Sequence, residues 1–128
     1  GLYASRSYID DFGCPTSSDE LRHHRVIGYG DRLATLPENR WLLDHSGPAS
    51  QVLSSDSTST RLRATLAGVG ISIQPVLFAG NNPQLVPLLE GRALPGHDMW
   101  LVYHNDLRQI ARVRAVLNFI TAHLSAEN

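Results

Sequence analysis

The chain has 128 residues, of which 42% are hydrophobic and 18% are charged, so it can form one modest globular domain and is not intrinsically disordered. Its formal net charge of -1 excludes the concentrated basic surface that non-specific nucleic-acid binding requires. The single cysteine, Cys14, excludes an internal disulfide and a thiolate zinc cluster, and suits a reducing compartment. No apolar run is long enough to span a bilayer and no signal peptide is recognisable, so we expect a cytoplasmic protein.

The beginning of the chain is predicted to contain strands and two short helices. It opens with the end of a strand that runs directly into a helix over residues 5–12, with Gly13 as the C-terminal cap. This abrupt opening suggests a fragment of a longer protein. A second short helix is expected from Ser17, whose spacing to Glu20 is that of a capping box, and a strand over residues 26–29 follows.

The middle of the chain is predicted to alternate short strands with helices. Runs of apolar residues indicate strands at 40–44, 51–54, 71–73 and 85–89, the last at an edge of the sheet. A helix over residues 58–67 places Leu62 and Leu66 one turn apart, and a helical turn follows Pro75. This alternation favours an α/β fold with an at least partly parallel sheet.

The last third is predicted to form one strand and one long helix. The apolar run from His97 to His104 indicates a strand that is covered on both faces. From Leu107 onward the apolar residues follow helical spacing, at Ile110, Val113, Val116, Leu117, Ile120 and Leu124. This stripe predicts the longest helix of the chain.

The helix that begins near Thr58 has an N-terminus rich in hydroxyl groups, in the segment Asp56-Ser57-Thr58-Ser59-Thr60. Its unpaired backbone N–H groups, hydroxyl donors and helix dipole are suited to the carboxylate of a small organic ligand. Each such charge-assisted contact is worth roughly 1.5–3 kcal/mol. Plain N-capping with exposed hydroxyls is the alternative, and the residues alone favour it.

Signals of metal binding and catalysis are weak. None of the six histidines forms an i, i+4 pair on a helix, and no zinc-protease motif is present, so we expect neither a metal site nor a cofactor. The chain also lacks a Gly-x-Ser-x-Gly elbow and a phosphate-binding glycine loop. We therefore expect no enzyme. A small α/β hydrolase that uses a serine with His97 or His104 is the catalytic alternative.

Four segments, in order, resemble segments of LysR-type transcriptional regulators. The opening Leu2-Tyr3-Ala4-Ser5-Arg6-Ser7-Tyr8-Ile9 is similar to their ASPAYL-type segment, although Arg6 stands where many members have proline. The stretch from Asp19 to Ile27 is similar to their DL-x-x-H helix and the strand after it. Ala67-Gly68-Val69-Gly70-Ile71 with Pro75 resembles their alaGlGIallP element, and Trp100 to Ile120 resembles their closing strand and helix.

The resemblance implies the C-terminal part of a bacterial effector-binding domain. The expected fold is the second lobe of a type II periplasmic-binding-protein-like α/β domain with crossover strands and a C-terminal helix. Residues 1–128 are then a partial effector-binding domain, in which residues 5–97 form the second lobe and residues 98–128 the crossover strand and C-terminal helix. The N-terminal helix-turn-helix of the family is absent from this chain.

The resemblance also implies where an effector binds. The start of the 58–67 helix faces the interlobe cleft in this fold, the strand at 26–29 ends at the same cleft, and one further candidate lies at the hinge-side helix start. The implied contacts to a small organic acid or amino-acid-like effector are Ser57, Thr58, Ser59, Gly28, Tyr29 and Ser5. The alternatives are a buried core role for Tyr29 and a simple cap role for Ser5.

The implied function is effector sensing. Effector binding closes the two lobes and changes the geometry of paired domains, and operator DNA is bound only through the missing N-terminal domain. A fragment of a periplasmic-type solute-binding protein is the non-enzymatic alternative. A lobe cut at its crossover strands exposes apolar residues, so we expect self-association as a dimer or larger species, by edge pairing or by swapping of the terminal helix, and no membrane partner. The residues expected to lose neighbours are Trp100, Val102, Ile110 and Val116.

Overall fold

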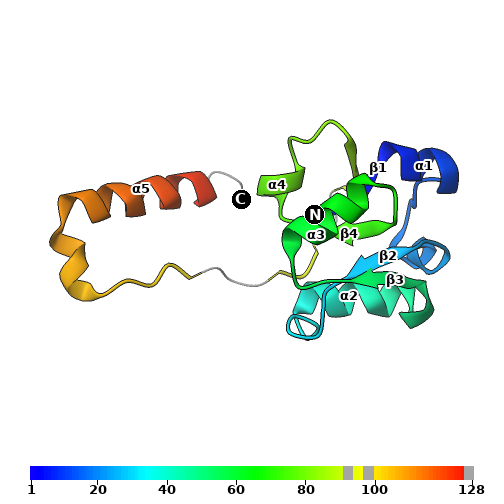
Figure 1. The fold of residues 1–128 in the computed structure, drawn as a ribbon, viewed down its shortest axis with the longest axis horizontal. Coiled ribbons are helices and arrows are strands. Elements are labelled where there is room, and N and C mark those ends of the chain that lie inside the picture. Colours follow the sequence, from blue (N-terminus) through cyan, green and yellow to red (C-terminus); the bar gives the residue numbers. More distant parts are fainter. Residues whose placement is uncertain (91–93, 97–99, 126–128) are drawn as a thin grey trace. The chain divides into compact units, whose positions relative to one another are not determined.

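The computed structural model describes residues 1–90, 94–96 and 100–125. The chain divides into two compact units, residues 1–97 and residues 98–128, and each is described by itself. The first unit contains a five-stranded sheet with helices on both faces (Figure 1). The second contains two helices.

The sheet is mixed, as the alternating pattern predicts. Its strands are β1 (Leu2–Ser5), β2 (Val26–Gly28), β3 (Gln51–Ser54), β4 (Ile71–Ile73) and β5 (Leu85–Leu88), in the spatial order β3-β2-β4-β1-β5. Strand β2 is parallel to both β3 and β4, whereas β1 is antiparallel to β4 and β5. Strand β5 lies at an edge, as expected, where Pro87 is tolerated because an edge strand leaves some N–H groups unpaired.

Two sets of helices cover the two faces of the sheet. One face carries the larger core cluster, with residues of α1 (Arg6–Phe12), the 3-10 helix at Ser18–His23 and α2 (Pro37–Ser46). This cluster consists of Leu2, Ala4, Tyr8, Leu21, Val26, Leu42, Ile71, Ile73 and Leu88. A smaller cluster joins Tyr3 and Leu85 to α3 (Thr58–Leu66) and α4 (Val76–Ala79). Burial of these apolar side chains is the main stabilising contribution to the lobe.

Most predicted helix ends are confirmed, and one cap is wrong. Helix α1 ends at Gly13, whose φ is 83° and whose N–H donates to the carbonyl of Ile9. Ser17 makes no side-chain cap. The Glu20 carboxylate accepts instead from the backbone N–H and the hydroxyl of Thr16, at 2.8 and 2.9 Å, so the capping box predicted at Ser17 is not formed.

The strand predicted at residues 40–44 is wrong, because this segment lies inside helix α2. Pro37 occupies the first turn, where its missing N–H costs nothing, and Gly47 ends the helix with a φ of 80°. Leu42 is fully buried while its neighbours Trp41 and Leu43 are half-buried. The Trp-Leu-Leu run therefore packs one face of a helix, which a short apolar run alone cannot distinguish from a strand.

The second unit contains a 3-10 helix at Asn105–Gln109 and helix α5 (Ala111–Ser125), which confirms the predicted long helix. Residues 100–104, predicted as part of a strand, lie outside helix and strand, and His97 and Met99 fall outside the described residues. A strand requires a hydrogen-bonded neighbour, and residues 100–104 are not among the strands of the described sheet. Within the described residues, no helix is long and apolar enough to cross a membrane.

Candidate functional site

The parallel strands β2 and β3 bring two predicted site segments to one edge of the sheet. Gly28 lies opposite Ser54 in the register of these strands, and the N–H of Ser55 donates to the carbonyl of Gly28 at 3.2 Å. Because parallel strands end on the same side, Tyr29 and the segment that leads into α3 emerge next to each other. This edge of the sheet is called the carboxyl edge below.

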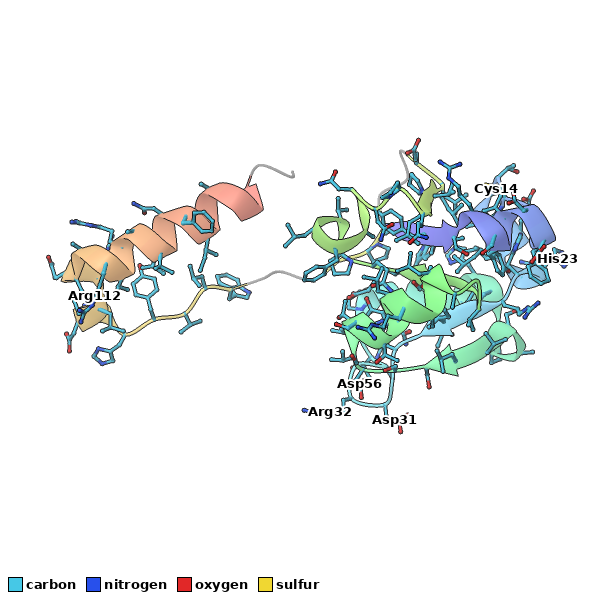
Figure 2. All side chains as sticks on the ribbon, turned by 45° about the horizontal axis from the view of Figure 1, so that its top comes forward. Cys14, His23, Asp31, Arg32, Asp56 and Arg112 are labelled. Carbon is cyan, nitrogen blue, oxygen red and sulfur yellow. The ribbon has the colours of Figure 1, made fainter. Side chains whose placement is uncertain are left out.

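Gly30 allows the loop before α3 to approach the end of β2. A Cβ atom at Gly30 would lie 2.8 Å from the Asp56 carboxylate and 2.9 Å from its backbone nitrogen, so a larger residue would displace the loop. The N–H of Leu33 donates to Asp56 Oδ1 at 3.2 Å. Figure 2 shows Asp56 at the same end of the first unit as Asp31 and Arg32. Gly30 therefore permits a close approach of this loop to the end of β2.

Tyr29 is held by groups from two helices. Its backbone N–H donates to Asn39 Oδ1 at 2.8 Å, and its hydroxyl contacts Glu38 Oε1 at 3.4 Å. The guanidinium carbon of Arg61 lies 3.9 Å from the centre of its ring. Burial raises the pKa of the Tyr29 hydroxyl, Glu38 raises it further and Arg61 opposes both. These contacts therefore fit a buried structural role for Tyr29 as well as they fit a role as an effector contact.

The N-terminus of α3 offers hydrogen-bond donors. Ser57 Oγ caps the helix by accepting from the N–H of Thr60 at 3.3 Å, and Thr58 Oγ1 accepts from Arg61 Nη2 at 3.2 Å. Neither hydroxyl donates its proton to an acceptor among the described residues. The backbone N–H groups of Thr58 and Ser59 have no partner among the described residues. A group that binds here must supply acceptors, as a carboxylate does.

A chain of buried hydrogen bonds anchors α3 to β4. Gln74 Nε2 donates to Ser72 Oγ at 2.8 Å, Ser72 Oγ lies 2.6 Å from Thr65 Oγ1, and Thr65 donates to the carbonyl of Arg61 at 2.8 Å. All three side chains are buried. Because the hydroxyls of Thr65 and Ser72 are both hydrogen-bonded, α3 is fixed in register against the sheet.

Ser5 lies away from the other predicted contacts. Strand β1 runs antiparallel to β4, with Leu2 opposite Ile73. Ser5 therefore lies at the end of the sheet where β2 and β4 begin, whereas Gly28 lies at the end where they finish. Its buried hydroxyl oxygen accepts from the N–H of Tyr8 at 3.2 Å and caps α1, even though Arg6 replaces the proline of the family pattern. The structure brings five predicted residues to the carboxyl edge and its loops, namely Gly28, Tyr29, Ser57, Thr58 and Ser59, and it does not bring Ser5 there.

Other residues at this edge are not among the predicted effector contacts: Glu38, Asn39, Asp56, Arg61 and Gln74. Pro37 followed by Glu38 is a helix-start signal, and recognising it would have placed Glu38 and Asn39 in a first helical turn. Arg61 offered no such signal, because helical spacing alone does not show that an arginine is buried. Its side chain is only 2% exposed.

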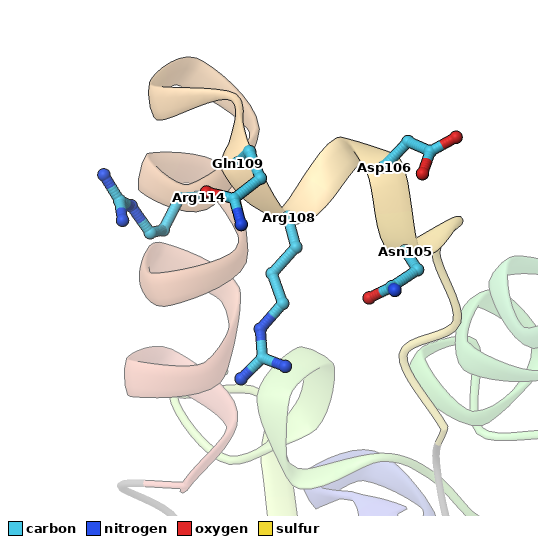
Figure 3. Close-up of a pocket in the computed structure, with 5 residues that line it drawn as sticks. All are labelled: Asn105, Asp106, Arg108, Gln109 and Arg114. Atoms are coloured by element: carbon cyan, nitrogen blue, oxygen red, sulfur yellow. The ribbon is translucent and has the colours of Figure 1, made fainter.

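The cysteine and the second unit are described separately from this site. Cys14 and His23 lie at a different end of the first unit from Asp56 (Figure 2). In the second unit a cavity of about 510 Å³ is lined by Asn105, Asp106, Arg108, Gln109 and Arg114, all exposed (Figure 3). No group of three or more potential metal ligands occurs among the described residues.

Of the two histidines of the hydrolase alternative, the structure describes His104. His104 Nδ1 accepts from the N–H of Asp106 and lies 3.3 Å from its carboxylate, an exposed pair. His97, the other histidine of the hydrolase alternative, lies outside the described residues.

The fold is that of a type II periplasmic-binding-protein-like domain, which LysR regulatory domains share. The regulatory domain of CrgA from Neisseria meningitidis superposes with a TM-score of 0.70 at 24% identity, over 96% of this chain and 63% of that one. The full-length AphB of Vibrio cholerae superposes with a TM-score of 0.67 at 21% identity, over 95% of this chain and 43% of that one.

The sequence comparisons define the family. The family described as LysR substrate binding domain matches residues 1–125, and the chain therefore belongs to it. A probable HTH-type transcriptional regulator, LtrA of Klebsiella pneumoniae, is 26% identical over 138 aligned residues, which cover 99% of this chain and 44% of LtrA. The chain thus spans less than half of that relative. The family is one of transcriptional regulators and not of enzymes.

Proposed function

We propose that this chain is the effector-sensing part of a LysR-type transcriptional regulator, and that it binds a small organic acid or amino-acid-like effector at the N-terminus of α3. The observation that carries the proposal is the set of free donors there, the N–H groups of Thr58 and Ser59 and the hydroxyls of Ser57 and Thr58. Gly28 and Tyr29 complete the site from β2. Ser5 is left out because it lies at the opposite ends of the strands from Gly28.

The effector acts in this proposal by changing lobe geometry. It can shift the equilibrium between open and closed lobes only by its differential affinity for the two states. The donors at the carboxyl edge supply that difference if the first lobe closes over them. Operator DNA is bound by another domain of the intact regulator, whose position in an oligomer responds to closure.

The proposal is tested by NMR titration of the isotope-labelled chain with a panel of small organic acids and amino acids. We expect the amide shifts caused by a binding acid to concentrate at Gly28, Tyr29, Thr58 and Ser59. The Thr58→Ala variant should lose about tenfold in affinity or more, because it removes a proposed hydroxyl donor and a charge-assisted hydrogen bond contributes about 1.5–3 kcal/mol.

Thr60→Ala is the matched control, since it removes an exposed hydroxyl from the same helical turn without touching the proposed donors. Equal affinity losses in the two variants, or shifts confined to the other edge of the sheet, would contradict the proposed site.

A further inference from the structure

Arg61 is a buried cation at an unfavourable position. It lies in the first turn of α3, where the positive end of the helix dipole disfavours a positive side chain. Its side chain is 2% exposed, so the guanidinium has also lost most of its water. Such a group is retained only where other contacts compensate for its desolvation.

The compensating contacts come from three segments of the carboxyl edge. Nη1 donates to the carbonyl of Ser55 at 2.6 Å, Nη2 donates to Thr58 Oγ1 at 3.2 Å, and the ring of Tyr29 lies beneath the guanidinium. Burial lowers the pKa of Arg61, while Tyr29, Asp56 and Glu38 act in the opposite direction. Nε has no hydrogen-bond partner among the described residues.

These contacts determine what the helix start can offer to a ligand. The carbonyl of Ser55 is engaged by Arg61, so this acceptor is not free to repel an anion. The oxygen of Thr58 is also engaged, so its hydroxyl is left with a proton to donate. The positive charge balances part of the negative charge of Asp56 and Glu38, which would otherwise oppose an approaching carboxylate.

We propose that Arg61 is the positioning residue of the effector site, and that through Ser55 and Thr58 it makes the site select an anionic ligand over an uncharged one of the same shape. The proposal rests on the proposed effector site at the start of α3. In this proposal Arg61 acts through its hydrogen bonds to Ser55 and Thr58 and does not contact the ligand.

The test compares acetate with acetamide, two probes of the same size of which only acetate carries charge. Dissociation constants are measured from the amide shifts of Thr58 and Ser59 in the chain and in its Arg61→Met and Arg61→Lys variants. We expect the wild-type chain to prefer acetate, and we expect Arg61→Met to reduce the ratio of the two affinities by about tenfold. Arg61→Lys keeps the charge but cannot donate in the same forked geometry, so its ratio should fall between these values.

Two measurements separate positioning from a merely structural role. Urea unfolding shows whether each variant is folded. The ratio of the acetate and acetamide affinities is the second measurement, because a structural defect lowers both affinities without changing their ratio. Arg63→Met is the matched control, because Arg63 is exposed on the same helix and should keep the wild-type ratio.

The outcomes distinguish this inference from the proposed function. An unchanged ratio in both Arg61 variants overturns the role of Arg61 and leaves the effector site standing. If Arg61→Met does not fold, the ratio in Arg61→Lys decides. Absence of acetate-induced shifts at Thr58 and Ser59 in the wild-type chain overturns both proposals.

Discussion

Tyr8 shows how one buried hydroxyl can join three segments of the lobe. It is fully buried in α1, its oxygen accepts from the N–H of Arg25 at 2.9 Å, and it lies 3.2 Å from His24 Nδ1. The Tyr8 hydroxyl can donate its proton to His24 Nδ1 when the imidazole is neutral. Burial of His24, immediately before β2, favours this uncharged form.

Protonation of His24 should destabilise the fold. Burial lowers the pKa of this imidazole, Glu20 opposes the shift and His23 adds to it. The unfolded chain therefore takes up the proton first, and the free energy of unfolding should fall as the pH falls below 6.5, the ordinary value for histidine, and level off below the folded-state pKa. Urea unfolding across this pH range measures the effect.

The His24→Gln variant should reduce this pH dependence, since glutamine does not titrate. His23→Gln removes the neighbouring exposed imidazole and serves as the control, with an expected slope close to that of the wild-type chain. A His24→Gln variant that keeps the full wild-type slope would show that another group is responsible.

At the level of elements, the junction between α3 and β4 depends on a close backbone approach. A Cβ atom at Gly70 would lie 2.7 Å from the carbonyl oxygen of Arg25, which also accepts from the N–H of Ile71. Gly70→Ala should separate β4 from β2 and lower the free energy of unfolding by about 1–3 kcal/mol, as overpacking does in other proteins. Urea unfolding gives the value directly.

Gly96→Ala is the matched control, because nothing lies within 4 Å of a Cβ atom built there. We expect its stability to lie within about 0.5 kcal/mol of the wild-type chain. Equal free energies of unfolding for the two variants would contradict this prediction, because β4 and β2 would then separate at Gly70 without loss of stability.

The sequence pattern predicts elements whose signal is local. The stop at Gly13 and the strands at 26–28, 51–54 and 71–73 are confirmed because caps and short apolar runs specify them. The strand predicted at 40–44 is wrong because Trp41-Leu42-Leu43 has no period of its own, whereas Pro37 and Gly47 on either side begin and end a helix.

The candidate site could be predicted only in part for a related reason. Hydroxyl-rich capping at Ser57 is visible in the sequence, and its confirmation as a cap follows from local geometry. That Arg61 and Glu38 are buried beside Tyr29 depends on strand register and on the packing of α2 and α3, which no local pattern encodes. Ser5 was grouped with the site although its strand runs in the opposite direction to β2.

For the whole molecule, exposed apolar surface is the property that bears on self-association. In the second unit Trp100, Val102 and Val116 are each more than half exposed, whereas Ile110, for which exposure was also predicted, is half-buried. In the first unit β3 is an edge strand, and Val52 projects from it, 46% exposed. Apolar surface and an open strand edge both favour association.

We therefore predict that the chain self-associates, and sedimentation velocity over a range of concentrations measures this association.

Two variants separate the two routes of association. Val116→Glu places a charge on the apolar surface of α5 and should abolish association that is mediated by the terminal helix, whereas Val52→Lys should abolish pairing through the edge of β3. Ala115→Glu adds the same charge at the next exposed position of α5 and should change little. A wild-type chain that remains monomeric at all concentrations contradicts the prediction. If only Val52→Lys is monomeric, the sheet edge carries the association and α5 does not.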